Sequence, residues 1–325
     1  MGSLLYTFAY NSFMSHILVS GSIAYDRIMD FPGLFGDHFL PEKLHTINVS
    51  FQVDTLAENF GGTAGNIAYS LKLLREEPQI IAVGGSDFAR YKTYLERLGI
   101  DSSSVRIEGS EFTSTAYIMT DKADNQIAAF SVGAGKVPYE PLPHTDDASC
   151  AIIAAGCLGD MRAFPAHFRG AGVPFFFDPG QAMTALSDDD IKNGIEGSEA
   201  VFGNDYEFNL ISKRTGMSEQ ELLEKTKTLV ITYGEKGSRV VSKEGESRVA
   251  AVQVKEVEDP TGAGDAYRAG FIAGYLKKLP PETCAALGAT VAAYAVENYG
   301  TQNHSFTRKE LAERYESAYK HPLPL

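Results

Sequence analysis

The chain has 325 residues, of which 44% are hydrophobic and 22% are charged, so it can bury the core of an ordinary globular protein. A formal net charge of −13 argues against wrapping of nucleic acid and against binding to an anionic membrane. No apolar run reaches the roughly 18 residues that a membrane-spanning helix needs. The three cysteines lack metal-ligand spacing and no signal peptide is recognised, which favours reduced thiols and a cytoplasmic location.

Residues 1–13 lack both the basic segment and the cleavage site of a signal peptide, and Met14 comes shortly before the first strand-like run. We interpret 1–13 as an upstream extension or an expression remnant, so the native start is either Met1 or Met14. The remainder, 14–325, contains no repeat, low-complexity tract or long linker. It is expected to form a single domain.

Short apolar runs alternate with helical patterns along this domain. Strands are expected at 17–21, 80–84, 151–155, 174–178, 200–203 and 229–232, and helices at 65–74, 89–98 and 289–301. The strands are apolar throughout, as in a parallel sheet that helices cover on both faces. The pattern predicts an α/β fold with a doubly wound, mostly parallel central sheet and crossover helices on both faces.

Three further segments alternate polar and apolar residues, which is typical of strands that expose one face. They are 47–53, 115–120 and 126–131, and a turn at 122–125 joins the last two. Because they break the rhythm of buried strands and helices, we expect them to form exposed antiparallel strands outside the central sheet.

The segment 259–271 reads Asp-Pro-Thr-Gly-Ala-Gly-Asp-Ala-Tyr-Arg-Ala-Gly-Phe, a glycine turn that opens directly into a helix. The glycines let the backbone approach a ligand, and the free amides of a helix start bind anions such as phosphate. Asp265 at that start suits a base that takes a proton from a hydroxyl attacking phosphorus. The alternative is a purely structural turn in which Asp265 caps the helix. Neither a P-loop nor a dinucleotide-binding glycine pattern is present.

A second segment, 59–71, reads Asn-Phe-Gly-Gly-Thr-Ala-Gly-Asn-Ile-Ala-Tyr-Ser-Leu. The two segments resemble the signatures of the ribokinase-like (PfkB) family of sugar and nucleoside kinases, in the same order, and the resemblance extends over nearly the whole chain. It implies phosphoryl transfer that depends on ATP and Mg²⁺. It assigns Asp265 as the base and the amides of Gly262, Ala263 and Gly264 as donors to the transferred phosphoryl group.

The resemblance also implies a small β-sheet lid over the substrate, formed by roughly 26–56 and 113–133. Four residues would hold the sugar in such a kinase: Asp26, Gly61, Gly62 and Asn66. For Asp26 the alternative is a solvated carboxylate in a loop. A capping role for Asn66 is disfavoured because this residue comes after the helix start.

Further residues would serve the nucleotide and its cations. Those that match the family's nucleotide-binding region are Asn204, Thr232, Gly234, Gly237 and Asn298. Glu207, in Asn-Asp-Tyr-Glu after a strand, would place Mg²⁺ through its waters. Asp259 would be a ligand of a monovalent cation such as K⁺. The alternatives are a helix cap at Asp205 and a plain hairpin turn around 232–237.

The substrate is expected to be adenosine or a related purine nucleoside, phosphorylated on its 5′-hydroxyl. Phe51, Tyr117 and Phe130 are candidates to stack on a base, with Phe130 chosen as the substrate contact. The segments 21–33 and 44–51 also resemble bacterial and archaeal adenosine-kinase-like members. The alternatives are a sugar kinase for ribose or fructose and a non-catalytic ligand-binding member. A monomer or a homodimer is expected, with no nucleic-acid or membrane partner.

Overall fold

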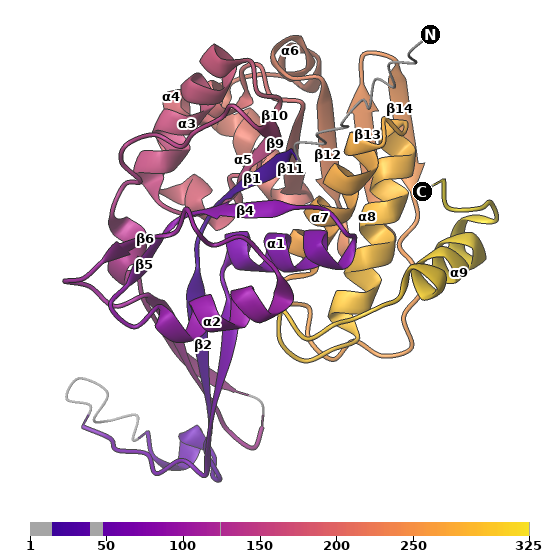
Figure 1. The fold of residues 1–325 in the computed structure, drawn as a ribbon. Coiled ribbons are helices and arrows are strands. Elements are labelled where there is room, and N and C mark those ends of the chain that lie inside the picture. The colour runs from indigo at the N-terminus through magenta and orange to yellow at the C-terminus, as the bar shows by residue number, and fades with distance from the viewer. Residues whose placement is uncertain (1–14, 40–47, 124, 325) are drawn as a thin grey trace, which may run out of the picture.

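The structure is a computed structural model that describes residues 15–39, 48–123 and 125–324. The strands of its central sheet are β1 His16–Ser20, β4 Pro78–Ile81, β9 Ala148–Ile153, β10 Phe175–Phe177, β11 Ala200–Asn204, β12 Thr228–Thr232, β13 Ser238–Ser242 and β14 Gly245–Val249. They form one eight-stranded sheet in the order β14-β13-β12-β11-β10-β9-β1-β4 (Figure 1). The strands from β12 to β4 in this order are parallel, and β13 and β14 add antiparallel pairs at one edge.

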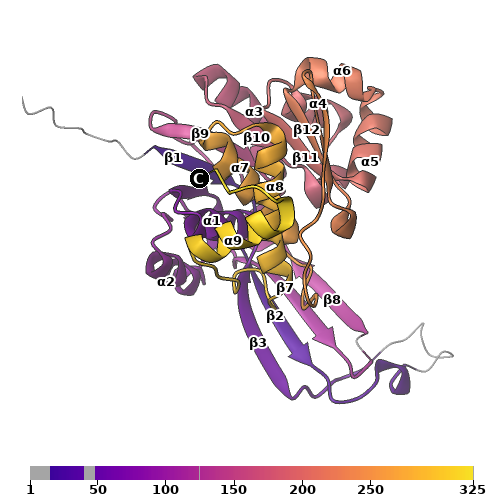
Figure 2. The ribbon, with the colours of Figure 1, turned by 90° about the vertical axis from the view of Figure 1, so that its right-hand side faces the viewer.

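Helices cover both faces of this sheet. They are α1 Thr63–Leu73, α2 Ala89–Leu98, α3 Leu158–Ala171, α4 Asp188–Ile195, α5 Asp205–Thr215, α6 Glu219–Lys225, α7 Ala263–Leu276, α8 Pro281–Val296 and α9 Arg308–Tyr319. In β9, Cys150 and Ile152 belong to one buried cluster, while Ala151 and Ile153 belong to another. The first cluster includes α1, α2, α7, α8 and α9, and the second includes α3 to α6 (Figure 2). The expected doubly wound, mostly parallel α/β fold is confirmed.

Local sequence signals set many of the helix boundaries. In a capping box, a Ser, Thr or Asn and the acidic residue three positions later exchange hydrogen bonds with each other's backbone amides. Such pairs are Ser187–Asp190 in α4, Asn204–Glu207 in α5, Ser218–Glu221 in α6 and Thr307–Glu310 in α9. Left-handed glycines end α2, α3 and α5, because this conformation terminates a helix with little steric penalty for glycine.

A second sheet of four strands extends from the body of the molecule, and we call it the lid sheet (Figure 2). Its strands are β2 Ala24–Asp30, β3 Thr55–Gly61, β7 Ser114–Thr120 and β8 Gln126–Ser131, in the order β3-β2-β7-β8. The β7–β8 antiparallel hairpin is the one expected from the sequence, whereas β2 is parallel to β7. A separate parallel pair consists of β5 Val83–Gly85 and β6 Arg106–Glu108.

The segment 47–53 was expected to be a strand, and the structure differs. Its described part, 48–53, has no regular structure, and β3 begins only at Thr55. Ile47 lies outside the described residues. The apolar position at Phe51 reflects packing against neighbouring aromatic rings rather than alternation along a ladder.

Two other expected elements have different bounds. The run 80–84 is divided between β4 and β5, because β1 pairs only as far as Ile81. The alanine-rich helix expected at 289–301 is α8, which begins at Pro281 and ends at Val296. Proline suits a first helical position, where its missing N–H is not needed. No helix within the described ranges combines the length and the apolarity that crossing a membrane requires.

Candidate active site

The segment 259–271 forms a turn and the first part of α7, as its sequence predicts. Helix α7 begins at Ala263, and Gly262 before it has φ +77°, a left-handed conformation that favours glycine. The amides of Gly264 and Asp265 lie in the first helical turn, where no preceding turn can accept their hydrogen bonds. The turn thus presents backbone donors at the positive end of the helix dipole.

This turn is packed against the loop that follows α8. A Cβ atom on Gly262 would lie only 3.0 Å from Cβ of Thr301, so the missing side chain permits the contact. The amide of Ala263 donates to the carbonyl of Pro260 at 3.3 Å. That hydrogen bond is longer than the usual range of about 2.7–3.2 Å. Ala263 must therefore exchange a weak internal bond for an anion if it is to act as a donor.

Asp265 occupies the third position of α7, where its carboxylate meets α1. The side-chain amide of Asn66 donates to Oδ2 of Asp265 at 2.8 Å. Burial raises the pKa of Asp265 to about 7, although the Asn66 hydrogen bond and the charge of Arg268 act to lower it. A carboxylate with this pKa can accept and release a proton near neutral pH. The structure brings together Asn66 and Asp265, which come from the two separate glycine segments.

A buried ion pair holds the start of α7 on the central sheet. Arg268, one turn after Asp265, donates from Nε to Oδ2 of Asp178 at 2.7 Å and from Nη2 to Oδ1 at 3.0 Å. Its Nη1 donates to the carbonyl of Gly264 at 3.2 Å. Neither partner was assigned a site role from the sequence. A signal was present, because Asp178 ends an expected strand and Arg268 belongs to the glycine-turn segment.

Asp26 lies on β2 of the lid sheet and not in a solvated loop. It is opposite Asn59 in the β2–β3 ladder. A Cβ atom on Gly61 would come within 2.5 Å of Oδ2 of Asp26, so glycine leaves room for the carboxylate. Burial, and then the charge of Asp259, raises the pKa of Asp26 to about 6. A carboxylate that has lost part of its hydration gains from hydroxyl donors of a ligand.

The turn at Gly61 and Gly62 joins β3 to α1. Gly62 has φ +87°, and a Cβ atom there would lie 2.5 Å from the carbonyl oxygen of Ser22, so this turn requires glycine. Asn66 is the fourth residue of α1, and its backbone amide donates to the carbonyl of Gly62 at 2.9 Å. Asn66 is therefore not the helix cap. These contacts make a continuous region from Asp26, through the glycine turn and Asn66, to Asp265.

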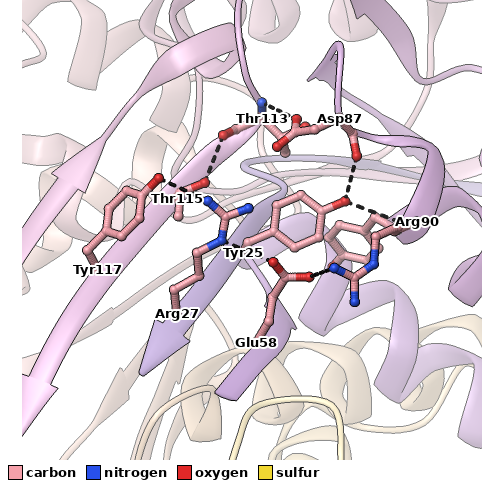
Figure 3. A network of polar contacts seen from close by, with 9 residues as sticks. Tyr25, Arg27, Glu58, Asp87, Arg90, Thr113, Thr115 and Tyr117 are labelled. Carbon is pink, nitrogen blue, oxygen red and sulfur yellow. Dashed lines mark hydrogen bonds and ion pairs between the residues drawn. The ribbon is translucent and has the colours of Figure 1, made fainter. Parts of the chain in front are cut away.

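Strand register separates the candidate aromatic residues of the lid sheet. Asp26 is opposite Ala116, and Ala116 is opposite Phe130, so Asp26 and Phe130 share one face of the sheet. Phe130 is 58% exposed on that face. Tyr117 points to the other face, where Arg27 donates to its hydroxyl at 3.0 Å (Figure 3). Tyr117 therefore lies on the wrong face of the sheet to stack on the base of a nucleoside whose sugar contacts Asp26.

Phe51 is not on the lid sheet. Its ring packs edge-on against Phe31 and Phe35, with ring centroids 4.8 and 5.3 Å apart. Phe31 and Phe35 stack on each other at 5.6 Å, and His38 and Phe39 complete the cluster. The aromatic residue in this segment therefore serves local packing, and Phe130 is the lid aromatic that shares a face with Asp26.

Asn204 and Glu207 form the capping box of α5, directly after β11. The amide of Asn204 donates to Oε2 of Glu207 at 2.7 Å, and the amide of Glu207 donates to Oδ1 of Asn204 at 2.8 Å. Asn204, and not Asp205, is the helix cap. Burial raises the pKa of Glu207, and the charges of Asp178 and Arg268 also act on it in opposite directions. Glu207 is thereby close to the ion pair beneath Asp265.

Thr232 ends β12, and the turn after it leads back into β13 as an antiparallel hairpin. The amide of Gly237 donates to the carbonyl of Gly234 at 3.0 Å, and the amide of Tyr233 donates to the carbonyl of Gly237 at 2.8 Å. Both glycines have positive φ, 58° at Gly234 and 89° at Gly237. The hairpin interpretation of this segment is confirmed, and residues 234–236 at its tip are exposed.

Asp259 ties the glycine turn to the loop after α8. Its Oδ1 accepts the amide of Thr261 at 2.9 Å, and its Oδ2 accepts the amide of Gly300 at 3.1 Å. In the same loop, the side-chain amide of Asn298 donates to the carbonyl of Tyr294 at 2.8 Å. No group of three or more His, Cys, Asp and Glu side chains in the described part of the chain is arranged to hold a metal ion.

Comparison with known proteins identifies the family of this chain. The model of the pfkB family of carbohydrate kinases matches residues 14–308. The chain is 33% identical over 280 residues to a nucleoside kinase of Methanocaldococcus jannaschii. The matched region covers 86% of this chain and 92% of that protein. It is similar to the structure of Burkholderia thailandensis nucleoside kinase in complex with inosine, with a TM-score of 0.80, 34% identity, and coverage of 94% of this chain and 99% of that chain. A ribokinase of Thermotoga maritima shares the fold, with a TM-score of 0.77 at 19% identity and coverage of 93% and 99%.

These similarities show that the protein is a phosphotransferase whose acceptor is an alcohol group. More particularly, the chain belongs to the pfkB family of carbohydrate kinases. The resemblance read from the two glycine segments is confirmed.

Proposed function

We propose that the protein transfers the γ-phosphoryl group of ATP to the 5′-hydroxyl of adenosine or a related purine nucleoside. The observation that carries this proposal is Asp265, a carboxylate with a pKa raised to about 7, beside the amides that begin α7. A base and anion-binding donors within one helical turn are two of the requirements of phosphoryl transfer to an alcohol.

In the proposed reaction, Asp265 accepts the proton of the 5′-hydroxyl as its oxygen attacks the γ-phosphorus. A bond forms between this oxygen and phosphorus, while the bond from phosphorus to the β–γ bridging oxygen breaks and ADP leaves. The amides of Gly262 and Gly264 stabilise the charge on the transferred group, joined by Ala263 when it releases Pro260. The product is the nucleoside monophosphate.

The proposed nucleoside site lies between the lid sheet and α7. Asp26 accepts hydrogen bonds from the two ribose hydroxyls, and Gly61, Gly62 and Asn66 contact the same sugar. Phe130 stacks on the base, since it shares the face of the lid sheet that carries Asp26. A nucleoside is favoured over a free sugar because the similar Burkholderia protein was solved with inosine and with ADP-inosine.

The remaining predicted residues are assigned to the nucleotide and its cations. We assign Asn204, Thr232, Gly234, Gly237 and Asn298 to ATP. The described residues lack a cluster of metal ligands, which suits a Mg²⁺ ion that neutralises phosphate charge and is held by phosphates and water, with Glu207 acting through a water. Asp259 is assigned to a monovalent cation such as K⁺, because each of its oxygens accepts one amide and keeps a lone pair.

A turnover assay with a panel of acceptors tests the proposal. The purified chain, ATP and Mg²⁺ are combined with adenosine, inosine, guanosine, cytidine, ribose or fructose, and ADP formation is followed. We expect kcat/KM to be highest for a purine nucleoside. An equal or higher value for ribose or fructose would assign a sugar kinase of the same family. Binding without turnover of any acceptor would indicate a non-catalytic member.

Location and assembly are also part of the proposal. The three cysteines are free thiols, which supports a reducing compartment such as the cytoplasm. We propose a small-molecule enzyme that acts as a monomer or a homodimer, and gel filtration with light scattering distinguishes these two states. Its acidic charge disfavours association with nucleic acid or an anionic membrane.

A further inference from the structure

The side chain of Gln302, in the loop after α8, is buried between α1 and α2. It is 4% exposed, next to Tyr91 at 0% and Asn66 at 5%. Its Nε2 donates two hydrogen bonds, one to Oδ1 of Asn66 at 3.0 Å and one to the hydroxyl of Tyr91 at 2.7 Å. Gln302 thus connects three segments that are far apart in the sequence.

In this series of hydrogen bonds, the chemistry of each group determines which atom donates and which accepts. The Tyr91 hydroxyl donates to the carbonyl of Gly61 at 2.8 Å, so its oxygen accepts the hydrogen bond from Nε2 of Gln302. Asn66 accepts from Gln302 through Oδ1, and this leaves its Nδ2 to donate to Asp265. If Asn66 were turned over, its oxygen would face the carboxylate of Asp265 and its NH₂ would face the NH₂ of Gln302. Both contacts would be repulsive.

The glycine at position 65 supplies an independent observation. A Cβ atom on Gly65 would overlap the hydroxyl of Tyr91 and would lie 2.9 Å from Nε2 of Gln302. Any larger residue would displace the two groups that orient Asn66. Gly65, which precedes Asn66 in α1, therefore leaves space for the hydrogen bonds of Gln302 to Tyr91 and Asn66.

We infer that Gln302 is a positioning residue for the phosphoryl transfer: it holds the amide of Asn66 in the orientation that donates to the ionised form of Asp265. This inference rests on the proposed role of Asp265 as the base. Gln302 does not contact the reacting atoms in this assignment, because Asn66 stands between it and Asp265. The series of hydrogen bonds ends at the carbonyl of Gly61, so it also joins Asp265 to the turn at Gly61 and Gly62.

The charges around Asp265 indicate what the loss of Gln302 would change. Arg268 on α7 faces Asp265 and favours its ionised form, while Asp178 after β10 opposes it. Glu207 of α5 acts on Arg268. The hydrogen bond from Asn66 lowers the pKa of Asp265 against the effect of burial. Without Gln302, Asn66 is free to turn and this hydrogen bond weakens, so the pKa of Asp265 is expected to rise.

The first test is the pH dependence of kcat/KM for the best nucleoside in Gln302→Leu and in Gln302→Glu, whose carboxylate cannot donate to Asn66. We expect the acid limb of the profile to move to higher pH in both variants. At neutral pH kcat should fall roughly three- to tenfold, the range of a lost hydrogen bond, with the KM for ATP unchanged. The matched control is Tyr94→Phe, because the Tyr94 hydroxyl donates only to the main-chain carbonyl of Gln302, at 3.1 Å. Its profile should match the wild type.

The second test does not need turnover. A ¹³C NMR titration of the Asp265 carboxyl in the full chain, assigned by its loss in Asp265→Asn, should give a higher pKa in Gln302→Leu than in the wild type. If Gln302→Leu does not fold, Gln302→Met keeps the length and removes the donors. An unchanged titration together with an unchanged acid limb would overturn the inference. A wild-type chain without kinase activity would instead contradict the proposed function, while the titration would still decide the role of Gln302.

Discussion

At the scale of single residues, two carboxylates of the site differ in what their environments prepare them to do. Burial is the main cause of the raised pKa of both, to about 7 for Asp265 and about 6 for Asp26. Asp265 already accepts a hydrogen bond from Asn66 and lies beside the first turn of α7. Asp26 lies on the lid sheet, with Gly61 leaving room beside it. The first arrangement suits proton transfer, and the second suits binding of hydroxyl groups.

Replacing the base tests the first role. Asp265→Asn keeps the shape of the side chain but cannot accept the hydroxyl proton, so kcat should fall by at least ~10²-fold, the scale of general-base catalysis. In the wild type, kcat/KM for the nucleoside should rise with pH through the pKa of Asp265, about 7. Steady-state kinetics from pH 5 to 9 measure both effects, and a variant with near-normal kcat would exclude Asp265 as the base.

The same carboxylate links stability to pH. Its pKa rises from 3.8 to about 7 on folding, so the folded state binds the proton more tightly than the unfolded state does. This stabilisation is fully present below about pH 4 and is lost as the pH rises through 7. Asp265→Asn should therefore gain stability over the wild type between pH 5 and 8, on the order of 2 kcal/mol once solvent screening is allowed for. Urea unfolding of both proteins at pH 5 and pH 8 measures this difference in stability. If the free energies of unfolding of the two proteins changed in parallel with pH, the linkage would be contradicted.

Removal of the sugar contact tests the second role. Asp26→Ala leaves ribose hydroxyls without their acceptor, so kcat/KM for the nucleoside should fall by the equivalent of ~1.5–3 kcal/mol, the range for hydrogen bonds to a charged group. The KM for ATP should change little, because Asp26 lies on the lid sheet, whereas Asn204 and Glu207 form the capping box of α5. Initial rates with each substrate varied in turn give both constants. A raised KM for ATP with unchanged nucleoside constants would mean that the two pockets are assigned in reverse.

At the scale of elements, the two faces of the lid sheet make different contacts. One face carries Asp26 and Phe130. The other face is tied to the body near α2: Arg27 pairs with Glu58 at 3.0 Å, Glu58 pairs with Arg90 at 2.7 Å, and Tyr25 donates to the carbonyl of Asp87 at 3.0 Å (Figure 3). These contacts tie this face of the lid sheet to the body, and they involve no residue of the face that carries Asp26 and Phe130, which is the face we propose for the substrate.

The difference between the faces gives a matched pair of variants. Phe130→Ala should lower kcat/KM for inosine or adenosine by the equivalent of ~1–3 kcal/mol, the scale of stacking on a base, and should affect ribose less. Tyr117→Ala removes an aromatic ring of similar size from the opposite face and should preserve the preference for nucleoside over ribose. Competition assays with both acceptors measure the preference. Equal losses for the nucleoside and for ribose in Phe130→Ala would remove base stacking from the proposal.

At the scale of the whole molecule, the site depends on contacts between the central sheet and the helices that cover it. The Asp178–Arg268 pair is the clearest of these, since both side chains are at most 8% exposed and the guanidinium lies over the ring of Phe202 at 5.5 Å. It joins the end of β10 to α7, and Arg268 also holds the carbonyl of Gly264 at the start of α7. Correct placement of the turn is thereby coupled to correct packing of the sheet.

Breaking this pair should lower the stability of the fold. Arg268→Met leaves Asp178 buried without its partner, which should lower the free energy of unfolding by about 3–5 kcal/mol. The double variant Arg268→Met/Asp178→Asn should recover part of that loss, because no unpaired charge remains. Urea unfolding of the wild type, both single variants and the double variant forms a double-mutant cycle. Strictly additive losses would show that the pair is not coupled.

The elements that could be predicted are those whose cause is local. The turn before α7, the capping box of α5 and the apolar strands are each determined by residues within a few positions, so the glycine segments, the α/β fold and the family could be recognised from the chain alone. Where local alternation had another cause, the prediction was wrong. The segment 47–53 alternates, yet Phe51 packs in an aromatic cluster.

Other features depend on residues that only folding brings together. Asn66 and Asp265 are 199 positions apart, and Gln302 and Asn66 are 236 apart, so no local pattern announces either hydrogen bond. The pKa of Asp265 depends on its burial and on Arg268, neither of which a sequence pattern contains. Strand pairing alone decided that Phe130 shares a face with Asp26 while Tyr117 does not, because shifting a strand by one residue reverses its faces. Local chemistry thus determined which residues could act, and long-range packing determined which of them meet.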